Sequence, residues 1–117
     1  MPSPHASSPT PERLNRLFAA LADGSRRAMV DRLARGPASV SDLAKPLAIA
    51  LPSALKHLAV LEAGGLVQSD KAGRVRTYRI APHAFEGLEA WVAARKAMWH
   101  RQFDALDALL AEQDSKP

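Results

Sequence analysis

The spacing of apolar residues changes twice along the chain, and this order restricts the folds that the sequence can adopt. From Pro11 to about Ala63, apolar residues recur every three or four positions, as on the buried face of helices. Between Leu66 and Ile80 they alternate as in strands, and the helical spacing returns from Phe85 to Gln113. The sequence therefore predicts a mainly α fold with four helices, a small two-stranded antiparallel hairpin and a long last helix, in that order.

Capping residues and glycine-containing stop signals predict the helix boundaries. The first three helices are preceded by residues whose side-chain oxygens can accept hydrogen bonds from a first turn. These predicted N-caps are Thr10, Asp23 and Ser39, with Ser41 as an alternative to Ser39. Stop signals at Gly36-Pro37 and Gly64-Gly65 end the second helix and the fourth, and the fourth begins at about Leu51. Pro46 should fray the last turn of the short third helix.

Length and composition favour one small intracellular domain. The chain has 117 residues, 47% of them apolar, and no cysteine, which excludes disulfides and thiolate metal sites. No apolar run approaches the ~18 residues of a membrane span, and the start has no secretory signal, so we expect a cytoplasmic protein without a membrane partner. Residues 1–10 are rich in Pro and Ser and are expected to form a disordered tail before a single domain over residues 11–113.

Positive charge is concentrated in the first two-thirds of the chain. Residues 1–81 contain 12 basic and 6 acidic residues, whereas residues 82–117 contain 4 basic and 6 acidic ones. The densest cluster lies in the predicted hairpin, whose turn is expected at Asp70–Gly73, and its members are Lys71, Arg74, Arg76 and Arg79. A basic hairpin can be an ordinary solvated surface, or it can contact the phosphates of nucleic acid.

The fourth helix has an apolar face and a small, nearly uncharged one. At 100° per residue, Ala54, Leu58 and Leu61 fall on the core side. The opposite side carries Pro52, Ser53, Lys56, Ala59 and Val60. Such a surface suits a helix that enters the major groove, and an ordinary amphipathic helix would also show it. With the basic hairpin, it predicts a winged helix-turn-helix: residues 39–64 form the helix-turn-helix, 66–80 the wing and 83–113 the last helix.

Residues 12–81 resemble the ArsR/SmtB type of bacterial winged-helix repressors. The segment Leu17–Leu33 contains ALADGSRR, which is similar to the family's opening ALADPTRR. Val40–Ala44 resembles the family's third helix, and Leu51–Val67, which contains HLAVLEAGGLV, resembles its recognition helix HLKVLEEAGLV. Gly73–Arg79 resembles the wing. Four such segments in the same order make the resemblance specific.

The resemblance implies a homodimer that binds a palindromic operator in double-stranded DNA and represses transcription. It implies DNA contacts by the recognition helix at Ser53, Lys56 and His57, by the wing at Arg74 and Arg76, and by Arg26 or Arg27 at the start of the second helix. Leu55 on the recognition helix is a further candidate contact. Two of these have alternatives. His57 could be a half-buried structural histidine, and Arg27 could pair with Asp23 or Asp31.

Two positions depart from the family's pattern on the recognition helix. Ala50 stands where a Ser or Thr often caps this helix, and Leu55 stands where a hydroxyl residue is common. Leu55 could contact a thymine methyl group or extend the core contact. Both changes remove hydrogen-bonding groups, so the operator sequence of other members cannot be transferred to this chain.

The last helix carries an aromatic stripe that resembles a metal-free, cysteine-less branch of the family. Such a stripe is expected to form the dimer interface together with the first helix. The predicted interface residues are Leu14, Leu17, Phe18, Trp91, Trp99, Phe103, Leu106 and Leu110. Packing into the chain's own core and a small-molecule pocket are the alternatives.

Metal sensing is a weaker alternative, and no cofactor is expected. Ser39 and Ser41 occupy the positions of a Cys-x-Cys metal pair. The last helix offers only the pairs His83/Glu86 and His100/Asp104, whereas zinc takes four ligands. The remaining alternative is a winged-helix module for protein interaction that does not bind DNA. The sequence shows no catalytic constellation, so an enzyme is not expected, and it does not identify an inducer.

Overall fold

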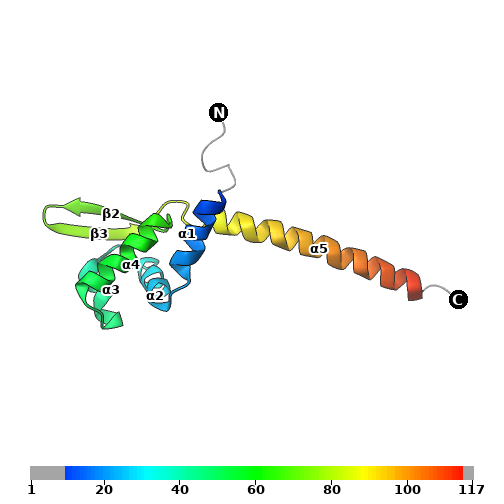
Figure 1. Ribbon diagram of the computed structural model, residues 1–117, viewed down its shortest axis with the longest axis horizontal. Helices are drawn as coiled ribbons and strands as arrows, with labels where there is room; N and C mark the ends of the chain where they lie inside the picture. Colours follow the sequence, from blue (N-terminus) through cyan, green and yellow to red (C-terminus); the bar gives the residue numbers. More distant parts are fainter. Residues whose placement is uncertain (1–9, 115–117) are drawn as a thin grey trace, which may run out of the picture. The chain divides into compact units, whose positions relative to one another are not determined.

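The computed structural model describes residues 10–114 and divides after Gly87 into two compact units. The first unit contains four α-helices, one 3₁₀ turn and a three-stranded antiparallel sheet (Figure 1). The second unit holds almost all of one long helix. The elements are α1 (Pro11–Leu21), α2 (Gly24–Leu33), β1 (Ala38–Ser39), α3 (Val40–Ala44), η1 (Lys45–Leu47), α4 (Leu51–Ala63), β2 (Val67–Ala72), β3 (Val75–Ile80) and α5 (Glu86–Asp114).

The predicted fold class is confirmed, and so are the N-caps of the first three helices. The last helix begins at Glu86, one residue after the predicted start at Phe85. The backbone N–H of Arg13 donates to Thr10 Oγ1 at 3.2 Å, and that of Asp42 donates to Ser39 Oγ at 3.2 Å. Asp23 caps α2 in the same way. The helix α2 ends at Leu33, before the predicted stop signal. The predicted tail over residues 1–10 lies outside the described residues except for Thr10, and the single-domain assignment stays a prediction.

The sheet differs from the predicted hairpin in two respects. A short strand that was not predicted, β1, pairs with β3 through Ala38 opposite Tyr78, so the strand order is β1-β3-β2. The strand β2 continues to Ala72, which pairs with Val75. The turn is therefore not Asp70–Gly73 but the two residues between Ala72 and Val75, and Gly73 supplies the positive φ of 62° that a tight hairpin needs.

The core of the first unit forms around α4. Ala54, Leu58 and Leu61 are each 0% exposed, as their spacing predicted. The helix contacts α1, α2, α3 and β2. The other core residues come from every neighbouring element and include Leu17, Ala20, Met29, Val30, Leu33, Leu43, Leu66, Val67 and Tyr78. Because α4 is packed on one side only, its opposite side is left on the surface.

Gly64, the C-cap of α4, allows α4 to approach α1 closely. A Cβ atom at Gly64 would lie 3.0 Å from Ala20 Cβ and 3.0 Å from the backbone oxygen of Arg16. Both distances are shorter than normal packing contacts, so any larger residue would push α1 away from α4.

Among residues 10–114, no single helix is long and apolar enough to cross a membrane. The bent pair Val40–Leu47 and Leu51–Ala63 meets the criterion of length and composition together. Its most apolar residues, including Leu43, Leu58 and Leu61, belong to the core of the first unit.

We predict that Gly64→Ala destabilises the fold and that Gly24→Ala does not. The added methyl group at Gly64 overpacks the α1–α4 contact, at a cost of about 1–3 kcal/mol. At Gly24 the nearest atom to a new Cβ is a flexible Arg27 nitrogen at 3.8 Å, so the substitution is tolerated. Urea unfolding of both variants measures the difference. Equal stability of the two variants would contradict the close approach of α1 and α4.

Candidate nucleic-acid interface

The helices α3 and α4 form a helix-turn-helix. The segments Val40–Leu47 and Leu51–Ala63 meet at 110°, within the range typical of this motif. The turn between them uses Ala48, which adopts the left-handed conformation with φ 54° and ψ 39°. Pro46 lies in the 3₁₀ turn η1, where the regular helix has already ended, as predicted.

The surface of α4 is exposed along its length. Its exposed residues are Leu51, Pro52, Ser53, Leu55, Lys56, Ala59, Val60, Glu62 and Ala63. Ala50 provides no side-chain hydrogen bond at the start of the helix. The N–H groups of Leu51 and Ser53 precede the first intrahelical bond, which Ala54 donates to the Ala50 carbonyl. These donors, at the positive end of the helix, suit a phosphate oxygen.

The wing places like charges side by side. In the register of β2 and β3, Lys71 is directly opposite Arg76, and Arg74 lies in the turn beside them. Like charges in opposite positions destabilise a sheet. Among the described residues, none of these three forms an ion pair, although Arg76 also donates to Ser69 Oγ at 2.9 Å. Arg79, by contrast, pairs with Asp70 at 2.9 Å. The wing tip is therefore an unneutralised basic cluster of Lys71, Arg74 and Arg76.

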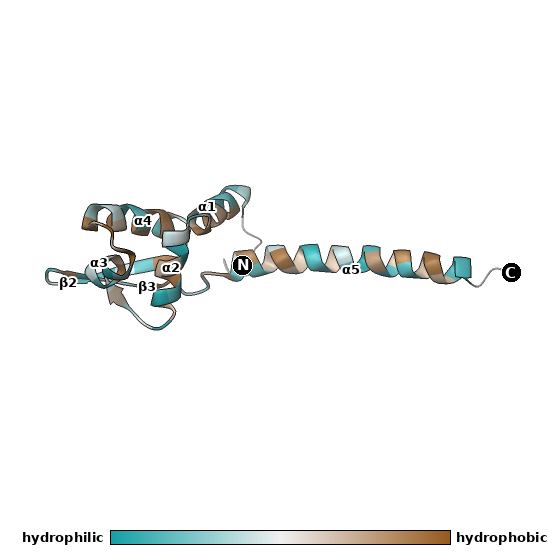
Figure 2. Ribbon diagram, turned by 90° about the horizontal axis from the view of Figure 1, so that it is seen from below, coloured by the Kyte–Doolittle hydropathy of each residue, from teal (hydrophilic) through white to brown (hydrophobic). Residues whose placement is uncertain are grey.

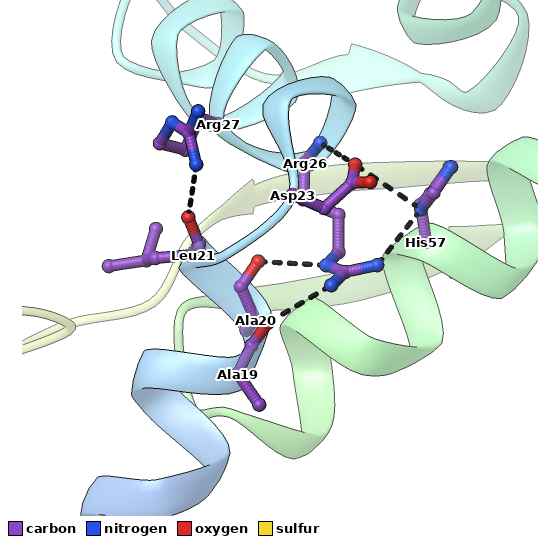
Figure 3. A network of polar contacts seen from close by, with 7 residues as sticks. All are labelled: Ala19, Ala20, Leu21, Asp23, Arg26, Arg27 and His57. Atoms are coloured by element: carbon purple, nitrogen blue, oxygen red, sulfur yellow. Dashed lines mark hydrogen bonds and ion pairs between the residues drawn. The ribbon is translucent and has the colours of Figure 1, made fainter.

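Arg26 links the end of α1 to α4 (Figure 3). Its Nε donates to the Ala20 carbonyl at 2.8 Å, and its Nη2 donates to the Ala19 carbonyl at 3.0 Å. Its Nη1 lies 3.3 Å from Nδ1 of His57 on α4. Two of these bonds satisfy carbonyls at the C-terminal end of α1, where a positive charge is favourable. All three guanidinium nitrogens therefore have partners within the fold.

Asp23 completes this network. Its Oδ2 accepts a hydrogen bond from the Arg26 backbone N–H at 3.0 Å and lies 4.0 Å from His57 Nδ1. The backbone hydrogen bond from Arg26, with the charge of the Arg26 side chain, lowers the pKa of Asp23 below its ordinary value of 3.8. The carboxylate is thus held in its charged form between α2 and α4.

His57 and Arg27 occupy different environments. The His57 side chain is 23% exposed and points toward Arg26 and Asp23, which favours the structural interpretation of this residue. The exposed Arg27 donates to the Leu21 carbonyl at 2.7 Å. In the described part of the chain it forms no ion pair with Asp23 or Asp31.

Apolar residues recur along the helix α5 (Figure 2). None of its residues is buried in the described part of the chain. Trp99, Phe103, Leu106 and Leu110 are between 50% and 62% exposed. Trp91 lies under the Arg95 guanidinium, at 4.8 Å from the ring centre.

On α1, Phe18 is exposed and Leu14 is half-buried, but Leu17 is only 6% exposed. The prediction that Leu17 lies in the dimer interface is therefore wrong, because this side chain is already covered by the core of its own chain.

The metal alternative gains no support from the described residues, which contain no group of three or more His, Asp or Glu able to hold a metal ion. His83 and Glu86 contact each other through Nδ1 and Oε1.

Sequence reasoning missed two residues that the structure places on this surface. Lys71 was counted in the charged hairpin but not among the DNA contacts, and the register with Arg76 would have indicated it. Leu51 was treated only as the start of a helix, although it is 47% exposed. The predicted turn was two residues early, which concealed both the register and the position of Arg74.

The fold and this surface define a winged helix-turn-helix protein, and comparisons with known proteins identify its family. A family described as "Helix-turn-helix domain" matches residues 21–70. The HTH-type transcriptional regulator Rv2034 of Mycobacterium tuberculosis is 43% identical over 74 residues, which are 63% of this chain and 69% of that protein.

Two solved structures are also similar. The crystal structure of the ArsR family transcriptional regulator RHA00566 has 49% identity and a TM-score of 0.75, and the match covers 80% of this chain and 97% of that one. The homodimeric winged helix-turn-helix DNA-binding domain of Mb0332 from Mycobacterium bovis has 32% identity and a TM-score of 0.60, over 76% and 84% of the two chains.

The chain therefore belongs to the ArsR family of winged helix-turn-helix transcriptional regulators. It is a transcriptional regulator with a helix-turn-helix DNA-binding domain. The similar proteins named above are described as transcriptional regulators.

We predict that Arg26→Lys destabilises the protein by about 1–3 kcal/mol, because a lysine cannot reach the Ala19 and Ala20 carbonyls and His57 together. The matched control is Arg27→Lys, which changes one exposed bond and should alter stability by less than about 0.5 kcal/mol. Thermal unfolding of both variants tests this. If Arg26→Lys proved as stable as Arg27→Lys, the hydrogen bonds of Arg26 between α1 and α4 would contribute nothing measurable to the stability of the fold.

Proposed function

We propose that this chain is a homodimeric repressor that binds a palindromic operator, with α4 in the major groove and the wing on the adjacent backbone. The observation that carries the proposal is the basic cluster of Lys71, Arg74 and Arg76 at the wing tip. Its repulsion costs stability in the free protein, and phosphate groups would relieve it. The cluster belongs to the same compact unit as the exposed face of α4.

The contacts divide into two classes. Wing residues Arg74 and Arg76, with Arg27 on α2 and the open N-terminus of α4, bind phosphates and set the register of the protein on DNA. Ser53 and Lys56, both exposed in the first half of α4, reach base edges. Arg26 and His57 act indirectly in this proposal, because their polar atoms hold α4 against the end of α1.

The dimer forms through α1 and α5 in this proposal. The similar Mb0332 domain is described as homodimeric. Trp91, Trp99, Phe103, Leu106 and Leu110 on α5, with Leu14 and Phe18 on α1, would be covered by the second copy. Burying such a stripe between two chains removes a large exposed apolar area from water. A dimer also presents two recognition helices, as a palindromic operator requires.

A module for protein interaction without DNA binding is the second candidate. The observation in its favour is that Leu51 and Leu55 on α4 are 47% and 46% exposed, since exposed apolar side chains often mark a protein contact. An interaction surface of this kind would not need the unneutralised cations of the wing. The two candidates differ in the salt dependence of DNA binding.

We predict that the double variant Arg74→Gln, Arg76→Gln binds DNA with a flatter salt dependence. Each phosphate contact contributes about 0.9 to the slope of log K against log salt, so losing four contacts per dimer lowers the slope by about 3–4. The control is Arg35→Gln, Arg101→Gln, which removes the same charge from exposed sites elsewhere. Fluorescence anisotropy across a salt series measures both slopes. A slope that falls equally in the two variants would contradict the role of the wing.

We predict that Trp99→Ala raises the dimer dissociation constant by roughly thirtyfold, since truncating a central aromatic residue costs about 2 kcal/mol. Met98→Ala is the control, because Met98 is also exposed but lies about 100° from Trp99 around the helix. Sedimentation equilibrium of both variants gives the constants. A Trp99→Ala protein that dimerises as tightly as Met98→Ala would refute the proposed interface.

A further inference from the structure

We propose that α4 recognises its operator through the C5-methyl groups of pyrimidines, contacted by Leu51 and Leu55. This inference rests on the proposed function and adds the chemical feature that the helix reads. The methyl group is carried by thymine and equally by 5-methylcytosine, and it projects into the major groove at the same place on both bases.

The sequence of α4 leaves little capacity for reading bases by hydrogen bonds. Reading a guanine or an adenine in bidentate fashion requires Arg, Lys, Asn or Gln. The helix, LPSALKHLAVLEA, contains only Lys56 from this group. His57 is turned toward Arg26 and Asp23, and Ser53 is short. Most of the sequence preference must therefore come from other contacts or from the shape of the DNA.

Leu51, Leu55 and Ala59 form a continuous exposed apolar stripe on α4. Successive members are four residues apart, so they lie about 40° from one another around the helix and one turn apart along it. Leu51 is 47% exposed and Leu55 is 46% exposed, and Ala59 is also on the surface. The two leucines stand in the first two turns, which are the part of a recognition helix that reaches base edges.

The positive charge around the stripe favours DNA as the molecule that contacts it. The unit that carries it also carries Lys56 and the basic cluster of the wing, with no acidic residue among the outward residues in the first half of α4. A second copy of this chain would bring the same positive charges to the contact and be repelled. DNA brings phosphates, and the C5-methyl group is the one apolar feature that its bases present in the major groove. A leucine side chain can pack against this methyl group, and neither of the two groups needs a hydrogen-bond partner.

The test begins with the full-length protein and an operator selected from a library of random duplexes. Each thymine of the selected site is then replaced by uracil, which removes only the methyl group. We expect at least one position per half-site where uracil weakens binding about fourfold, the factor for burying one carbon group. At that position, 5-methylcytosine should exceed cytosine by a similar factor, because the leucines read the methyl group and not the pairing edge.

Variants of the stripe separate a direct contact from an effect of the methyl group on DNA shape. The double variant Leu51→Ala, Leu55→Ala should bind thymine and uracil sites equally, since both residues are exposed and the fold should not suffer. The control is Val60→Ala, which lies on the same helix outside the stripe, near its C-terminal end, and should keep the fourfold ratio.

Three outcomes would overturn the inference. If the protein binds a specific site and no uracil substitution weakens that binding, the methyl contact is contradicted and the proposed function is not. A thymine-to-uracil ratio that persists in the double leucine variant would assign the effect to DNA shape. Failure of the selection to yield any bound sequence would refute the proposed function together with this inference.

Discussion

The burial of Ala54, Leu58 and Leu61 is the constraint on which the rest of the structure depends. These three residues of α4 have no exposed surface, and the helices α1, α2 and α3 and the strand β2 all contact the helix that carries them. A helix anchored along one face has no rotational freedom, so the opposite face is fixed as well. The identity of the residues that face outward is therefore decided by the spacing of the residues that face inward.

Polar contacts add to this anchoring where packing alone is weak. Near the end of α1, the Ala20 carbonyl accepts a hydrogen bond from Arg26 Nε, and the Ala19 carbonyl accepts from Arg26 Nη2 as well as from the Ala22 N–H. The third guanidinium nitrogen of Arg26 reaches His57. Gly64, at the C-terminal end of α4, permits α1 and α4 to approach each other closely. The helix α4 is thus held by a close approach at its C-terminal end and by a charged network nearer its middle. Arg26 and His57, which the sequence offers as DNA contacts, both have polar atoms in this network.

Much of the fold could be predicted because its signals are local. The caps at Thr10, Asp23 and Ser39 act on N–H groups within their own first turns, and the apolar spacing of α4 spans only a few turns. The strand β1 escaped prediction because two residues show no alternation, and their pairing partners Tyr78 and Thr77 are remote in sequence. The turn at Gly73 and the network of Arg26 depend on register and on contacts between helices, which no local pattern records. Leu17 was misassigned because an apolar stripe does not say whether the chain itself or a second copy covers it.

The central claim is that this chain recognises a specific operator as a dimer. The most direct measurement is fluorescence anisotropy of the full-length protein on the DNA upstream of its own gene and on a scrambled duplex of equal length, titrated to saturation. The account predicts tight binding to the upstream DNA, at two chains per duplex, and much weaker binding to the scrambled one. Equal affinity for both duplexes, or one chain per duplex at saturation, would contradict it.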